Sequence, residues 1–163
     1  MHTNPDYALT IVAHDLEQRV VVNKTRFSHN IKYTGANLNQ VSKLVEISAA
    51  CGQELSHDCQ NAPIYPTSGA IKMNAWWLDR RGKQVKSWGN SRHDYRCDCG
   101  NDKSCSGGKK FGCNCDVADS VLRRDEGIVK DRRQLPINTV IVNGRSGDDQ
   151  YRAIKVGQLV CSG

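Results

Sequence analysis

The sequence predicts an α+β fold with antiparallel strands, one main helix and a long loop region that is stapled by disulfides. Short runs of β-branched and apolar residues, separated by turn residues, recur along the chain and are typical of antiparallel strands. One longer stretch carries apolar residues at helical spacing. Residues 97–115 hold five of the eight cysteines among glycines, charges and small polar residues, so this loop has too few apolar side chains to fold by burial.

Two strands are expected before the helix. Tyr7–His14, YALTIVAH, mixes β-branched and apolar residues and predicts a buried strand. Arg19–Val22, RVVV, predicts a second and shorter strand. The polar segment Arg26–Gly35 that follows is expected to be irregular.

The helix is predicted from the spacing of apolar residues within Leu38–Leu55. We expect it to run from about Asn39 to about His57. Asn37 or Asn39 is the expected N-cap, because an asparagine side chain accepts hydrogen bonds from the free N–H groups of a first helical turn.

The second half of the chain predicts four strands, two before and two after the cysteine-rich loop. The expected strands are Ala75–Leu78, Val85–Trp88, Ile137–Val142 and Arg152–Val156. A hairpin turn around Gly82 is expected to join the first two. Ala118–Glu126 is expected to form a short helical or irregular piece that ends at Gly127.

The cysteines are interpreted as a disulfide framework, for which their even number is suited. They are Cys51, Cys59, Cys97, Cys99, Cys105, Cys113, Cys115 and Cys161. In the alternative, the pairs Cys97/Cys99 and Cys113/Cys115 supply four thiolates to one zinc ion. Disulfides are favoured, because a single residue separates each pair where structural zinc sites use two to four, and because Cys105 would have no role.

The connectivity of the framework stays open, since eight cysteines allow about 105 pairings. The helix prediction restricts one of them. If Cys51 and Cys59 share a continuous helix, their Cα atoms lie about 12 Å apart. A disulfide spans roughly 4.4–6.8 Å between Cα atoms, so these two cysteines would need other partners.

Length and composition predict a single domain over residues 1–163, with a hydrophobic content of 38% that is ordinary for a globular protein. No apolar run approaches the roughly 18 residues of a membrane span, so we expect no membrane insertion. The start, MHTNPDYALT, lacks the basic and apolar regions of a signal peptide. We therefore expect an excised piece of a longer secreted or membrane-anchored protein, located outside the cell or on its surface.

The formal net charge of +6 favours acidic partners at long range, although salt screens this attraction. The candidate acidic-partner surface comprises Arg80, Arg81, Lys83, Lys86, Arg123, Arg124, Arg132 and Arg133. Acidic residues interleave with these cations, which leaves an ordinary solvated face as the alternative. Nucleic acid is not expected as a partner, because no recognised binding motif is present.

The sequence carries a modification motif but no catalytic one. Asn23-Lys24-Thr25 is an acceptor for N-glycosylation on Asn23. The adjacent pairs His14-Asp15 and His57-Asp58 seldom direct two side chains into one site, and the nucleophile, zinc-protease and phosphate-loop motifs are missing. We therefore do not expect an enzyme.

The order of several motifs resembles the fibrinogen-like domain of the contactin-associated proteins, which are neurexin-IV-type cell-adhesion receptors. The similar segments are TIVAHDLE, CGQELSHDC, WWLDRRGKQVKSWG, CDCGNDKSC, CNCD, RRDEGIVKDRRQLPINTVIV and VGQLVC, from about Leu9 to Cys161. The most specific parts are the two Cys-x-Cys motifs, the double tryptophan Trp76-Trp77 with Trp88 after it, and the run that ends at Leu135-Pro136.

The resemblance implies a fibrinogen C-terminal-like fold without the N-terminal part of that domain, in a non-enzymatic extracellular module for cell adhesion. Its expected partner is an extracellular protein or a sulfated glycan. A secreted matrix component and a calcium-dependent, lectin-like glycan-binding domain are the alternatives. Fibrinogen-type domains commonly hold a calcium ion in the corresponding loop, which makes Asp98, Asp102 and Asp116 candidate ligands, with solvated loop acids as the simpler interpretation.

Overall fold

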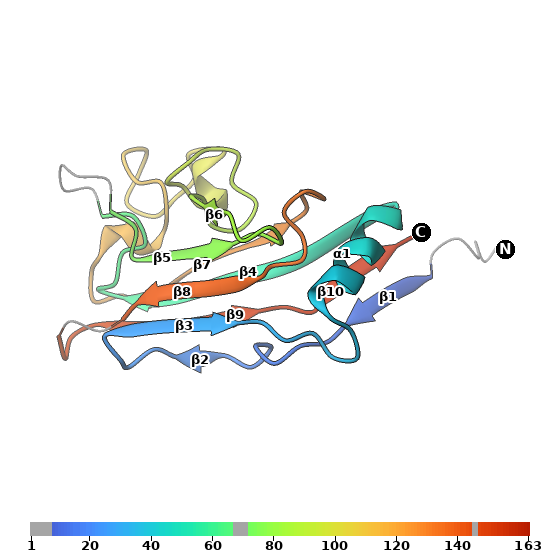
Figure 1. The fold of residues 1–163 in the computed structure, drawn as a ribbon. Helices are drawn as coiled ribbons and strands as arrows, with labels where there is room; N and C mark the ends of the chain where they lie inside the picture. The colour runs from blue at the N-terminus through green and yellow to red at the C-terminus, as the bar shows by residue number, and fades with distance from the viewer. Residues whose placement is uncertain (1–7, 67–71, 145–146) are drawn as a thin grey trace, which may run out of the picture.

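The computed structural model describes residues 8–66, 72–144 and 147–163, in which antiparallel strands and one α-helix form an α+β arrangement (Figure 1). The larger sheet contains, in spatial order, β1 (Leu9–Val12), β10 (Leu159–Ser162), β4 (Ala50–Gln60), β9 (Tyr151–Val156) and β2 (Val20–Val21), and β7 (Arg123–Val129) also pairs with β4. The smaller sheet contains β3 (Arg26–Asn30), β8 (Thr139–Asn143), β5 (Ala75–Leu78) and β6 (Gln84–Val85).

The two sheets share one hydrophobic core. Trp77 and Val140 from the smaller sheet and Leu55 and Ile154 from the larger one are fully buried and belong to a single cluster. Adjacent strand residues point to opposite faces of a sheet. Trp76 therefore lies on the outer face of β5, where it is half-buried and the Arg26 guanidinium stands 5.6 Å from its ring centroid.

The helix α1 (Leu38–Ile47) is shorter than expected. Asn37 is its N-cap, and the side chains of Asn37 and Gln40 each accept a hydrogen bond from the other residue's backbone N–H. Val41 and Val45 are the buried contacts of the helix with the core. The helix ends at Ile47, and the chain turns at Ser48 into β4.

The expected continuation of the helix to His57 is wrong, because residues 50–60 form the long strand β4. The strand pairs with β10 over residues 50–52, with β7 over 53–59 and with β9 over 55–60, so that every one of its residues has a partner on at least one neighbouring strand. Polar residues occupy many of its buried positions, including Gln53, Ser56 and His57. The period-two apolar pattern of a strand is therefore missing from the sequence, and tertiary pairing decides the conformation.

Two segments that were not expected to form strands, one helical or irregular and one irregular, also contain them. Within Ala118–Glu126, strand β7 starts at Arg123 and continues beyond Gly127, with Asp125, Gly127 and Val129 facing inward. Within Arg26–Gly35, strand β3 pairs with β8 as an edge strand. Both were missed because an inward carboxylate, an inward glycine and polar edge residues do not look like a strand pattern.

Other expected strands are present, Ala75–Leu78 with the expected bounds and the rest with different ones. Arg19–Val22, Ala75–Leu78, Ile137–Val142 and Arg152–Val156 correspond to β2, β5, β8 and β9. Val85–Trp88 contributes only its first residue to β6, and Gly82 takes the positive φ of 78° in the turn before it. Tyr7 lies outside the described residues, and the strand after it, β1, is largely exposed rather than buried.

The cysteine-rich loop contains only two short 3₁₀ turns, η1 (Asp98–Gly100) and η2 (Cys115–Val117). In Figure 1 the loops between β6 and β7 gather at one end of the molecule, away from α1 and β1. None of the helices in the described part of the chain has the length and apolar character needed to cross a bilayer.

Candidate functional site

All eight cysteines are paired, as the disulfide interpretation expected. The bonds are Cys51–Cys161, Cys59–Cys115, Cys97–Cys113 and Cys99–Cys105. The zinc alternative is wrong in this structure, because the sulfurs of the two Cys-x-Cys motifs are bonded to one another or to Cys59 and Cys105. Cys51 and Cys59 do have other partners, although both lie on strand β4 rather than on one helix.

Carboxylates tie the cysteine-rich loop to the rest of the fold. Asp125 on β7 accepts hydrogen bonds from the backbone N–H groups of Asn114 (2.8 Å) and Cys115 (2.7 Å), one at each carboxylate oxygen. Asp116 accepts bonds from Ile64 and Tyr65, both 2.9 Å long and both at Oδ1. Burial raises the pKa of Asp116 to about 7 and that of Asp125 to about 6.

The three candidate calcium ligands are used separately. Asp116 is buried against Ile64 and Tyr65, whereas Asp102 is exposed and accepts a bond from the Ser104 hydroxyl. Asp98 accepts a 2.6 Å bond from the backbone of Asn90. Among the residues the structure describes, no group of three close metal-binding side chains includes any of these aspartates, so the geometry does not assemble a calcium centre from them.

Two other groups of donors are close enough for a metal, but each contains a disulfide. The groups are His57 with Cys59 and Cys115, and Asp125 with Cys97 and Cys113. Bonded sulfurs are not thiolates, and the thiolate is the metal ligand. His57 is fully buried, and burial lowers its pKa well below the usual value.

The histidine–aspartate pairs diverge, as the sequence predicted. His57 points into the core near the Arg152 guanidinium, whereas Asp58 pairs with Arg124 at 2.6 Å and with Arg19 at 3.1 Å. The ring of His14 accepts a bond from the Leu16 backbone, whereas Asp15 pairs with His29.

The eight predicted basic residues do not form one face. Arg123 and Arg124 lie on strand β7, where Arg123 pairs with Asp119 at 2.7 Å and Arg124 pairs with Asp58. Arg80 turns toward α1, where it reaches Glu46 at 3.5 Å, and Arg132 donates to the Ala49 carbonyl. The remaining four, Arg81, Lys83, Lys86 and Arg133, line one groove.

We call this groove of about 840 Å³ the cationic groove. Its walls are the β5–β6 turn, the loop of residues 87–94 and the loop of residues 131–134. Arg92, from the middle wall, adds a fifth exposed cation. These cations stand in separate stretches of the sequence, and only the fold shows which of them line the same groove.

A second surface was not predicted from the sequence. Leu9, Ile11, Ile128 and Val160 are exposed large apolar residues on β1, β7 and β10, and we call them the apolar sheet face. The register places them on one side of the sheet, because Ile11 lies opposite Val160, Val160 opposite Gly52, and Ile128 opposite Glu54 two residues along β4.

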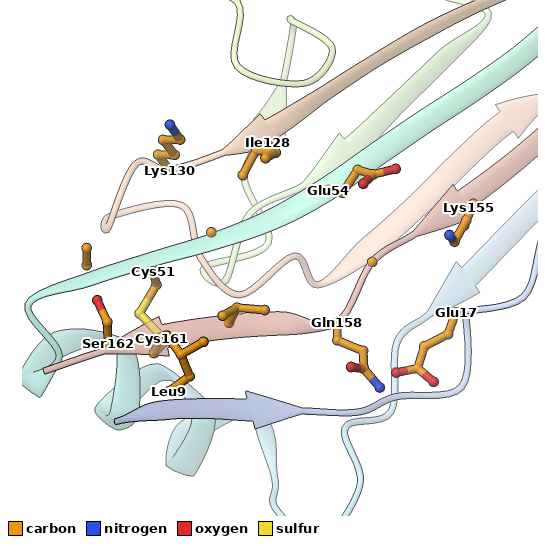
Figure 2. A pocket seen from close by; sticks show the side chains of 14 residues that line it. Leu9, Glu17, Cys51, Glu54, Ile128, Lys130, Lys155, Gln158, Cys161 and Ser162 are labelled. Atoms are coloured by element: carbon orange, nitrogen blue, oxygen red, sulfur yellow. A yellow bond between two sulfur atoms is a disulfide. The ribbon is translucent and has the colours of Figure 1, made fainter. Parts of the chain in front are cut away.

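A pocket of about 740 Å³ lies on this face, with Leu9, Ile128 and Val160 in its lining. Figure 2 shows this pocket from close by, with Leu9 and Ile128 labelled. Gly52 in its floor leaves room for the Ile128 side chain, which a Cβ at that position would meet at 2.9 Å. Charged side chains of both signs surround the apolar centre. They are Glu17, Glu54, Lys130 and Lys155. The signal that could have indicated this surface is the run Leu9–Val12, whose apolar residues the sequence assigned to the core.

No protein-family model matches the chain. Contactin-associated protein 1 from mouse, human and rat is in each case 29% identical to it over 161 residues. These alignments cover 96% of this chain and 12% of each relative, so the chain spans a small part of their length. The similarity supports a region related to the contactin-associated proteins.

Proposed function

We propose that this chain is a non-enzymatic, extracellular module for protein interaction and cell adhesion, of the contactin-associated-protein kind. The apolar sheet face carries the proposal. An exposed apolar centre with a charged rim is the anatomy of a protein–protein contact, and scattered surface apolar residues would not share one pocket. The four disulfides fit an oxidising, extracellular compartment.

The proposed occupant of the apolar sheet face is a folded extracellular protein. The relatives are named for their association with contactin, so a contactin ectodomain is the first partner to test. The rim suits such a partner, because Glu17, Glu54, Lys130 and Lys155 offer both charge signs for orientation. We also propose that the fold corresponds to part of a fibrinogen-like domain.

A matched pair of variants tests the docking surface. Leu9→Ser with Ile128→Ser removes two side chains that are 60% and 47% exposed. Val121→Ser with Leu122→Ser removes two that are 53% and 64% exposed in the segment before β7, outside the pocket. We expect the first pair to weaken binding to immobilised contactin, or to contactin-bearing cells, by about tenfold or more and the second to leave it unchanged. Equal effects, or no binding by the wild type, would contradict the proposal.

We also propose an acidic partner class, the sulfated glycans of the cell surface or matrix, because five exposed cations share the cationic groove. A secreted matrix role would use the same chemistry. The calcium-dependent lectin alternative has less support, since Asp98, Asp102 and Asp116 are engaged separately.

Secretion would make Asn23 a glycosylation site. Asn23, Lys24 and Thr25 are all exposed in the turn between β2 and β3, where an enzyme can reach the side chain. We predict a glycan on Asn23 in protein made by a eukaryotic secretory system, seen as a mass increase of the peptide that Thr25→Ala abolishes. An unmodified Asn23 peptide from such material would count against secretion.

A further inference from the structure

We propose that the cationic groove is the binding site for a sulfated glycan chain, held rigid by the cysteine-rich loop. This inference rests on the acidic-partner class of the proposed function and adds the site, its recognising groups and the role of the disulfides. It concerns a surface separate from the apolar sheet face, since the residues that line the two are different.

The groove holds more positive charge than its acids can offset. Five cations, Arg81, Lys83, Lys86, Arg92 and Arg133, face three aspartates, Asp79, Asp94 and Asp131, which leaves a formal charge of 5 − 3 = +2 with His93 neutral. Within the described ranges, no ion pair engages Lys83, Lys86 or Arg92. These three side chains are exposed and available to an external anion.

The remaining two cations keep donors free. Arg81 and Arg133 each contact one aspartate, at 3.5 Å and 3.2 Å, while their side chains are 61% and 81% exposed. A guanidinium carries five N–H donors, so a sulfate can bind beside the aspartate. Asp79 itself is buried and accepts hydrogen bonds from the backbone N–H groups of Arg81 and Lys83, so its carboxylate stabilises the β5–β6 turn.

The other lining groups favour a glycan over an acidic peptide. They are amides, hydroxyls and backbone, from Gln84, Ser87, Asn90, Ser91 and Gln134, together with the exposed imidazole of His93, and the one aliphatic member, Val85, is buried. Peptide docking relies on apolar or large aromatic anchors, and this groove presents no exposed aliphatic, Phe, Tyr or Trp side chain for them to contact. Hydroxyls and sulfate esters of a glycan can instead be matched by amide and hydroxyl groups between the cations.

The cysteine-rich loop fixes the middle wall of the groove. Asp98 accepts the Asn90 N–H at 2.6 Å, and Asn101 accepts the Arg92 N–H at 2.9 Å while donating to the Asn90 carbonyl at 3.3 Å. Asp98 lies between the disulfide-bonded Cys97 and Cys99, and Asn101 follows Cys99 by two residues.

The Asp98 carboxylate is itself packed into the fold. It fills the space above Gly127 of β7 and beside Gly89, where a Cβ would collide with it. The backbone of Arg80 donates to the Gln134 carbonyl at 3.0 Å, which joins the two outer walls. Cations on fixed walls lose less entropy on binding than cations on free loops, so this bracing strengthens recognition.

The test compares two triple variants with the same loss of charge. Lys83→Gln, Lys86→Gln and Arg92→Gln neutralise the groove. Lys24→Gln, Lys32→Gln and Lys43→Gln neutralise three exposed lysines elsewhere. The measurements are salt elution from immobilised heparin and titration with a heparin oligosaccharide at 0.15 M salt, with the thermal midpoint as the folding control. We expect wild-type elution above physiological salt and roughly tenfold weaker binding in the groove variant only.

Each other outcome has a distinct meaning. Wild-type elution below physiological salt would overturn the acidic-partner class and this site with it. Equal loss in both triple variants would overturn the site but keep the acidic-partner class, because net charge alone would then explain retention. Unchanged retention on desulfated heparin would overturn sulfate recognition, because the carboxylates and hydroxyls of the glycan would then explain binding. Equal competition by polyglutamate of matched charge would overturn glycan recognition and assign the groove to acidic polypeptides.

Discussion

The end of the large sheet around β1, β10 and β4 and the loops around the cationic groove are shaped by different forces. At the sheet end, backbone ladders and a buried apolar face fix the geometry, and the side chains left outside form an apolar pocket. In the loops, two local disulfides and the carboxylates of Asp98, Asp116 and Asp125 hold backbone that has little apolar cover. A segment without a hydrophobic core can therefore still present a defined surface, provided that disulfides and hydrogen bonds to carboxylates replace the burial of apolar side chains.

Disruption of the shared core should give the largest effect. Trp77 is fully buried between the sheets, and its Nε1 donates to the Ser87 carbonyl of the groove wall at 2.9 Å. We expect Trp77→Ala to lower the free energy of unfolding by about 3–5 kcal/mol. Trp76→Ala removes a neighbouring ring that is half-buried under Arg26, and should cost no more than about 1.5 kcal/mol. Denaturant titration of both variants measures this difference, and similar costs would refute a core shared by the two sheets.

Loss of the disulfide that closes the longer segment of the loop should cost more stability, because the constraint on the unfolded chain grows with the logarithm of the segment length. Cys97–Cys113 spans 16 residues and Cys99–Cys105 spans 6. Constraint of the unfolded chain then gives about 3 kcal/mol for the first bond and about 2 kcal/mol for the second. Replacement of each pair by alanine, followed by thermal or denaturant unfolding, tests the order.

The two disulfide variants should lose structure in the loop and not in the sheets. Amide exchange should rise in residues 87–122 of both disulfide variants while β4, β8 and β9 keep their protection. Heparin retention should fall in parallel, because Asp98 and Asn101 would no longer hold Asn90 and Arg92 in place. Uniform loss of protection across the sheets would mean that the loop and the sheets do not fold as separable units.

The two buried aspartates should differ when each is changed to asparagine. Asp125 uses both of its oxygens, one for Asn114 and one for Cys115, so Asp125→Asn places an amide N–H₂ against a backbone N–H. We expect a cost of about 1–3 kcal/mol. Asp116 receives both of its bonds at Oδ1, which an asparagine oxygen can replace, so Asp116→Asn should cost less. Equal costs in denaturant titrations would contradict this assignment.

The same two aspartates, Asp116 and Asp125, should make the free energy of unfolding depend on pH. Because burial raises the pKa of Asp116 from 3.8 to about 7, the folded state holds a proton that the unfolded state releases between these values. The free energy of unfolding should therefore be highest near pH 4 and fall as the pH rises toward 7, by up to about 1.4 kcal/mol per pH unit for one group. Asp116→Asn should flatten this fall, leaving the smaller part due to Asp125, whose pKa is about 6. A fall of unchanged slope in the variant would exclude Asp116 as its source.

Local chemistry in the sequence predicted the parts of the fold that local interactions fix. An asparagine cap at position 37 or 39, the Gly82 turn and the apolar or β-branched strands β5, β8 and β9 follow from residue type and spacing. Strand β4 did not, because Gln53, Ser56 and His57 are buried there by pairing with distant strands. The sequence indicated the cations of the groove but not the groove itself. Lys83 and Arg133 line it together although they lie far apart in the chain, so only the tertiary fold brings them to one surface.

The smallest effect on stability should come from loss of an exposed side-chain hydrogen bond, the N-cap of α1. Asn37 accepts the Gln40 N–H at 2.9 Å at the start of α1, much as Asp98 accepts the Asn90 N–H in the groove wall. At the helix end, water can replace the lost acceptor, so Asn37→Ala should cost about 1 kcal/mol. Asn39→Ala is the matched control, because Asn39 lies inside the helix and exchange for a better helix former should cost nothing. Thermal unfolding of the two variants distinguishes the caps that the sequence left open. Equal midpoints would contradict the assignment of Asn37 as the stabilising cap of α1.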